Sequence, residues 1–137
     1  MSLANWFRRA TAPSTSPRVE KLLLDTAQYL ASRPSDDEFP AKIVASALSE
    51  SEMAALTALS LLEERGITQH HFGVYCSRRG VPLDTYENLK EIPENGRWRC
   101  EDCDEDHSVS DNSCRVEVYF TVDRDKLARF MAQSSAA

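Results

Sequence analysis

The chain has 137 residues, 42% of them hydrophobic, and a formal net charge of −6. This length suffices for one ordinary domain or two small modules, and no apolar run in the sequence reaches transmembrane length. The first nine residues lack the apolar core of a secretory signal. We therefore expect a cytoplasmic, reducing compartment, where paired cysteines more often bind metal than form disulfides.

Residues 1–15 are predicted to form a flexible tail, because Ala, Thr, Ser and Pro dominate the stretch that leads into the first helix. The tail contains an aromatic and basic cluster, Trp6-Phe7-Arg8-Arg9. Such a peptide can dock into a groove of a partner or touch an anionic surface. A disordered tail without a fixed partner is the simpler interpretation.

Two helices are predicted in the stretch that follows the tail. Ser16 caps the first helix, Pro17 suits its first turn, and Pro34 ends it. Pro40 opens a second, short helix that runs to about Leu48. The apolar spacing predicts which side chains face the core: Val19, Leu22, Leu23, Thr26, Leu30, Ile43, Val44 and Leu48.

A third helix follows at once and leads into a strand. Ser49 and Glu52 are spaced as a capping box at its start, and Gly66 supplies a left-handed stop at its end. Alternation of apolar residues then predicts a strand over Ile67–Cys76. The expected inward stripe of the helix consists of Met53, Leu56, Leu59 and Leu62.

The order of three helices, the middle one short, and then a strand resembles a winged helix-turn-helix domain. The ending Leu61-Leu62-Glu63-Glu64-Arg65-Gly66-Ile67 is similar to the close of the last helix in such domains of bacterial and archaeal proteins. The resemblance covers residues 18–76. It implies the fold and says almost nothing about function, and a plain three-helix bundle with a hairpin is the alternative.

The C-terminal half resembles a zinc-ribbon-like module that ends in a helix. The predicted fold class is therefore α+β: a winged helix-turn-helix at residues 16–76 packed on a small β-rich module at residues 77–132, with a disordered tail at 133–137. Its expected elements are a return strand at Val81–Tyr86, one helical turn at Glu87–Ile92, a knuckle at Trp98–Cys103, a strand at Val116–Val122, and a helix at Arg124–Met131 capped by Asp123.

Cys100-Glu101-Asp102-Cys103 predicts a metal knuckle, since two thiolates two residues apart grip one ion from one side. Cys76 and His107 complete the four ligands of a structural zinc site. The first half is degenerate, because Arg79 stands where a second CxxC would place its other cysteine. Cys114 competes with His107 for the fourth position, but strand parity directs it to the core. A ribbon that has lost its metal and a Cys76–Cys114 disulfide are the alternatives.

Catalysis and nucleic-acid binding are both disfavoured by the sequence. A cysteine nucleophile with His107 as its base has no glycine-rich elbow, and the chain has only four glycines. His70 and His71 are expected in an exposed turn. Residues 84–107 hold nine acids and three bases, which would repel phosphates. The third helix has no Arg, Lys, Asn or Gln before Arg65 that could contact the edge of a DNA base.

We therefore expect a non-enzymatic protein-interaction or regulatory subunit of a bacterial cytosolic system, with another protein of that system as its partner. The pairing of modules resembles accessory modules beside larger effector or ATPase proteins in bacterial conflict and defence loci. The resemblance implies a regulatory role and homo-oligomers are compatible with it. A DNA-binding transcriptional regulator and a Cys–His enzyme are the two alternatives.

Overall fold

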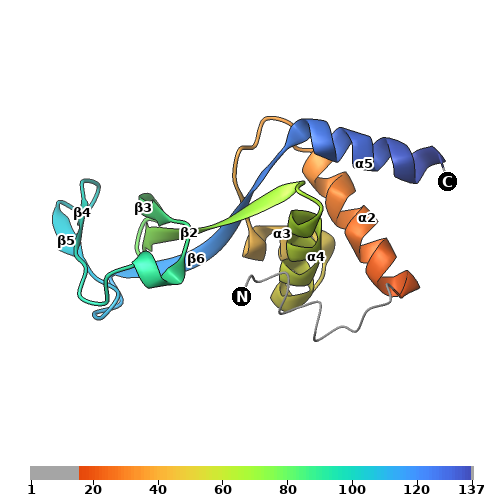
Figure 1. Ribbon diagram of the computed structural model, residues 1–137. Helices are drawn as coiled ribbons and strands as arrows, with labels where there is room; N and C mark the ends of the chain where they lie inside the picture. The colour runs from red at the N-terminus through yellow and green to blue at the C-terminus, as the bar shows by residue number, and fades with distance from the viewer. Residues whose placement is uncertain (1–15, 137) are drawn as a thin grey trace. The chain divides into compact units, whose positions relative to one another are not determined.

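The computed structural model describes residues 16–136; the predicted tail with its Trp6–Arg9 cluster, and Ala137, lie outside the described residues. The structure is α+β, with three helices, a small antiparallel sheet and a C-terminal helix (Figure 1). No helix in the described part is long and apolar enough to cross a membrane. The elements are α2 (Pro17–Ala31), β1 (Phe39–Pro40), α3 (Ala41–Leu48), α4 (Glu52–Glu64), β2 (Thr68–Cys76), β3 (Pro82–Tyr86), η1 (Leu89–Glu91), β4 (Trp98–Cys100), β5 (Glu105–His107), β6 (Cys114–Val122) and α5 (Arg124–Ala136).

The strands form two sheets, and the chain divides into two compact units. One sheet has the order β1-β6-β2-β3, and the other consists of β4 and β5. Within the described residues, the helical unit comprises residues 16–70 and 120–136, and the cysteine unit comprises residues 71–119. This division differs from the expected boundary after Cys76, because the end of β6 and all of α5 belong with the N-terminal helices.

Four helices build the core of the helical unit, in which α2, α3 and α4 contact one another and α5 contacts α2. Leu30, Val44, Leu59 and Leu62 are completely buried there, together with Phe120 from β6. Burying an aliphatic side chain of this size contributes about 1.5–3 kcal/mol. The helical unit therefore has an apolar core of its own.

Arg124 fixes the start of α5 against the end of α2. Its guanidinium donates hydrogen bonds to the backbone oxygens of Leu30 (2.8 Å), Arg33 (2.8 Å) and Asp36 (2.9 Å). These carbonyls lie at and beyond the helix C-terminus, where a cation is favourable and backbone acceptors need donors. This contact explains why a helix so distant in sequence belongs to the helical unit. The same helix extends to Ala136, beyond the end predicted at Met131.

The helix caps confirm one prediction and correct another. The Ser16 side chain accepts a hydrogen bond from the backbone nitrogen of Val19 at 3.2 Å, as predicted. The predicted Ser49–Glu52 capping box is wrong. Ser51 is the cap of α4, and its side chain accepts from the nitrogen of Ala54 at 3.1 Å. Ser49 instead ends α3 in the left-handed conformation, with φ of 55°.

Two apolar side chains that were expected inside are exposed. Ile43 on α3 is 56% exposed and Met53 on α4 is 55% exposed. The buried positions of α3 and α4 include small residues instead: Ala41, Ala45, Ala55 and Ala58. Val44, Leu59 and Leu62 are fully buried as well, so small and large side chains share the buried faces of α3 and α4.

The cysteine unit is built on two short antiparallel hairpins. In the first, β2 pairs with β3, with Val74 opposite Asp84 and a register irregularity after Val74. Gly80 lies in the connecting turn with φ of 70°, a conformation that favours glycine. Val74, Trp98 and Cys114 form the small core of this unit. The predicted return strand and the helical turn, here η1, are confirmed.

Candidate metal centre

The four predicted ligands come from separate elements of the cysteine unit and meet at one place. Cys76 is the last residue of β2, Cys100 is the last residue of β4, and His107 is the last residue of β5. Cys103 lies in the turn between β4 and β5, where Asp104 adopts a positive φ of 56°. The tight turn thus returns the chain so that Cys100, Cys103 and His107 face one point, and the first hairpin contributes Cys76.

Two of the distances between the donor atoms match those of a tetrahedral zinc site. All four donor atoms lie within 4.8 Å of one another. The Cys76 and Cys103 sulfurs are 3.7 Å apart, and the Cys76 sulfur is 3.5 Å from Nε2 of His107. With Zn–S of about 2.3 Å and Zn–N of about 2.0–2.1 Å, a regular tetrahedron gives about 3.8 Å and about 3.6 Å for these two pairs. The cluster could hold a metal ion such as zinc.

Burial and hydrogen bonds distinguish the thiols electrostatically. Burial raises the pKa of Cys76, but hydrogen bonds from the backbone N–H groups of Arg79 and Arg78 and from the other thiols outweigh it, and the pKa falls to about 6. The Arg79 nitrogen lies 3.4 Å from the Cys76 sulfur. Burial, with the hydrogen bonds to Cys76 and Cys100, raises the pKa of Cys103 to about 11. The hydrogen bonds therefore favour the thiolate form of Cys76 and disfavour that of Cys103.

The register of the second hairpin places the donors on one face. Trp98 pairs with His107 and Cys100 pairs with Glu105, and residues directly opposite on antiparallel strands share a face. Trp98, Cys100 and His107 are all buried. Arg99 and Asp106 form the pair between them and lie on the other face. Because side chains alternate between the two faces, each of these three-residue strands can carry a buried ligand next to a charged residue in solvent.

Cys114 lies outside the four-residue group. It is 2% exposed and packs with Val74 and Trp98, as strand parity predicted. Burial, followed by the nearby charges of Asp111 and Cys76, raises the pKa of its thiol. All four cysteines are free thiols, so the Cys76–Cys114 disulfide is not formed.

The two adjacent histidines lie elsewhere. Nδ1 of His70 contacts the Glu63 carboxylate at 2.8 Å, and both side chains are mostly buried. The ring of His71 stacks on Tyr119 with 5.1 Å between ring centroids. The expectation of an exposed turn is wrong for both, because they lie within β2. Neither joins the cysteines.

A hydrogen-bond network beneath the knuckle was not predicted. The Asp84 carboxylate accepts from the Tyr86 hydroxyl at 2.7 Å and from Nε1 of Trp98 at 3.3 Å. The Tyr86 bond, with the Thr85 backbone N–H, holds the pKa of Asp84 below its ordinary value. The network joins β3 to β4, the strand that carries Cys100. Its sequence signal, an acid two residues before a tyrosine in a predicted strand, is too common to have identified it.

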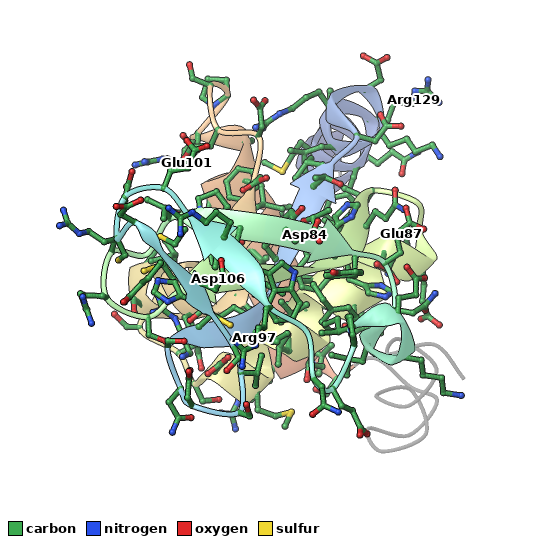
Figure 2. All side chains as sticks on the ribbon, turned by 90° about the vertical axis from the view of Figure 1, so that its left-hand side faces the viewer. Asp84, Glu87, Arg97, Glu101, Asp106 and Arg129 are labelled. Atoms are coloured by element: carbon green, nitrogen blue, oxygen red, sulfur yellow. The ribbon has the colours of Figure 1, made fainter. Side chains whose placement is uncertain are left out.

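Acidic side chains surround the cluster, with some paired to arginines. Arg78 lies 3.8 Å from Glu105, and Arg99 pairs with Asp104. Figure 2 labels Glu101 and Asp106 among the acidic side chains of this unit. The cysteine unit as a whole contains eleven acids and six bases. Its surface therefore carries a net negative charge.

No model of a known protein family matches the chain, and neither a curated protein nor a solved structure matches it. The winged helix-turn-helix and zinc-ribbon resemblances accordingly stay predictions. What the structure itself establishes is a Cys₃His cluster that suggests a metal-binding module in an α+β fold.

Proposed function

We propose that the chain is a non-enzymatic protein-interaction or regulatory module in which a structural zinc ion stabilises the cysteine unit. The main evidence for zinc is that the donor atoms of four residues converge, with two of their separations close to those in a zinc tetrahedron. These residues are Cys76, Cys100, Cys103 and His107. Three thiolates and an imidazole are soft and borderline donors of the kind that zinc takes in proteins.

A structural rather than a catalytic role follows from the number of donors and their burial. Four protein ligands leave no coordination position for water or substrate. Cys76 and Cys100 are completely buried, and His107 is 2% exposed. Since three thiolates around a divalent ion leave a charge near −1, the site is also a poor electrophile. The ion would therefore stabilise the fold and leave recognition to the surface.

Surface chemistry supports a protein partner over nucleic acid. The excess of five acids on the cysteine unit repels phosphates. On the helical unit, α4 begins with Glu52 and has no Lys or Arg along its length, so it lacks the usual readers of guanine. Exposed Ile43 and Met53 offer apolar contact area of the kind protein interfaces use. The resemblance to accessory modules of bacterial defence loci favours another protein of the same system.

Elemental analysis of the purified protein tests the zinc. We expect one zinc per chain in the wild type, its loss in His107→Ala, and its retention in Cys114→Ala, the matched control from the neighbouring core. A metal-free wild type that unfolds as cooperatively as a zinc-loaded sample would contradict the proposal and identify a ribbon that keeps its fold without metal.

Binding measurements test the interaction role. We expect no DNA binding that weakens with salt, and a stable complex with a protein encoded by a neighbouring gene. Salt-dependent DNA binding would instead favour the transcriptional regulator.

A Cys–His enzyme is the second candidate, and one specific contact favours it. The Cys76 sulfur lies 3.5 Å from Nε2 of His107. The pKa of Cys76 is lowered to about 6, although the backbone N–H groups of Arg79 and Arg78 and the other thiols, rather than His107, cause this. The complete burial of Cys76 counts against substrate access. Alkylation separates the two roles: a structural site protects its thiols until a chelator is added, whereas an enzyme is modified at once and loses its activity.

A further inference from the structure

We propose that Glu105 positions the metal-binding ring of His107 by accepting a hydrogen bond from its Nδ1. This inference rests on the proposed zinc site and adds a residue that supports it from outside the ligand set. The juxtaposition that points to it is Oε1 of Glu105 at 4.0 Å from Nδ1 of His107.

The Nδ1 atom of His107 is buried and has no hydrogen-bond partner among the described residues. When Nε2 binds a metal, Nδ1 carries the proton of the neutral ring and needs an acceptor. A metal-bound histidine almost always donates this second N–H to a carboxylate, a carbonyl or water, which fixes the tautomer and the ring orientation. The unpartnered nitrogen therefore marks the place where such an acceptor is required.

The hairpin register brings the Glu105 carboxylate to that place. Glu105 pairs with Cys100 and lies two residues before His107, so its side chain projects from the same face as both ligands. The separation of 4.0 Å is longer than a direct hydrogen bond, so the proposal requires the half-exposed Glu105 side chain to turn towards the ring when the metal is bound.

Arg78 lies near the same carboxylate oxygen. Its guanidinium lies 3.8 Å from Oε1 of Glu105, the atom that faces His107. Arg78 is two residues from Cys76, so the contact connects the turn after one ligand to the residue that orients another. Arg78 offsets the added negative charge beside the thiolates, and Glu105 keeps its acceptor oxygen towards the ring.

Chelator competition with Zn²⁺ on the full chain tests the positioning role through a matched pair of variants. Glu105→Ala and Asp106→Ala each remove one carboxylate from neighbouring residues of β5, but only Glu105 shares the face of the ligands. We expect Glu105→Ala, which leaves no acceptor oxygen, to weaken zinc affinity about tenfold or more, within the 10–100-fold range of such supporting residues, and Asp106→Ala to leave it within about threefold. Arg78→Gln should show a smaller loss than Glu105→Ala.

A spectroscopic measurement separates positioning from a general loss of structure. In zinc-loaded wild type, the Nδ1 proton of His107 should give a slowly exchanging resonance in ¹⁵N-edited spectra of the imidazole, which shifts or exchanges faster in Glu105→Ala and is unchanged in Asp106→Ala. Equal loss of affinity in both variants would reduce the effect to net charge, and no loss in Glu105→Ala would show that Glu105 does not support His107; either result overturns the inference. A wild type that binds no zinc would refute the metal site itself, a distinct outcome.

Discussion

The helical unit and the cysteine unit differ in what fills their interiors. Leu30, Leu59, Leu62 and Phe120, all completely buried, give the helical unit a conventional apolar core. The cysteine unit buries Val74 and Trp98 beside three cysteines and a histidine. A module this small rarely buries enough apolar surface to fold alone, and a structural metal is a common supplement. In the cysteine unit, cysteine and histidine side chains therefore fill buried positions that leucine and phenylalanine fill in the helical unit.

The largest expected effect is the selective loss of the cysteine unit when zinc is removed. Structural zinc contributes about 10–16 kcal/mol of apparent binding energy in small modules, more than the net stability of most domains. Hydrogen exchange read by mass spectrometry should show peptides from residues 77–113 losing protection on chelation, while peptides from α2 and α4 keep it. Addition of excess zinc should restore the protection. Equal loss of protection in both units would show that zinc does not stabilise the cysteine unit selectively.

A core substitution in the helical unit should have the converse effect. Leu59→Ala should lower the free energy of unfolding by about 2–5 kcal/mol, because it leaves a cavity in a fully buried site. Ile43→Ala, on the exposed face of α3, should change it by no more than about 0.5 kcal/mol. Urea titration followed by circular dichroism measures both, and zinc content should stay at one per chain in each variant. A Leu59→Ala protein without zinc would mean that the two units are not independent.

The smallest expected effects concern the junction of α3 and α4. Ser51→Ala should lower the free energy of unfolding by about 1 kcal/mol, since it removes the cap of α4. Ser49→Gly should leave it unchanged or raise it by up to about 1 kcal/mol, because glycine adopts the left-handed conformation at little cost. Thermal unfolding of both variants checks the assignment. If Ser49→Gly is destabilising and Ser51→Ala is neutral, Ser49 rather than Ser51 is the cap of α4.

Local chemistry made most elements predictable, and competing local signals produced the errors. Ser16 caps the first helix as expected because Pro17 marks the first helical position and so selects Ser16 over Ser14 and Thr15. In Ser49-Glu50-Ser51-Glu52 two serines compete for one cap, and the length of α3 decides between them. Ile43 was expected inside because its size dominates the apolar pattern, whereas the buried residues of α3 are Ala41, Val44 and Ala45.

Long-range contacts account for what the sequence could not provide. The four members of the Cys₃His cluster were identified from residue type and spacing, since few chemistries require cysteines two residues apart beside a histidine. The assignment of α5 to the helical unit depends on bonds between Arg124 and backbone oxygens about ninety positions earlier. The relation of Glu105 to His107 depends on the register of a hairpin, which no single sequence reveals.

The cysteine unit is inserted into the chain of the helical unit, between residues 70 and 120. During synthesis the whole insertion therefore leaves the ribosome before Phe120 and α5, which the earlier helices need to complete their core. All four ligands of the proposed zinc site would be available as soon as His107 has emerged, while the enclosing unit is still unfinished. Cellular zinc supply would then act on this protein at the moment of translation, ahead of its final folding step.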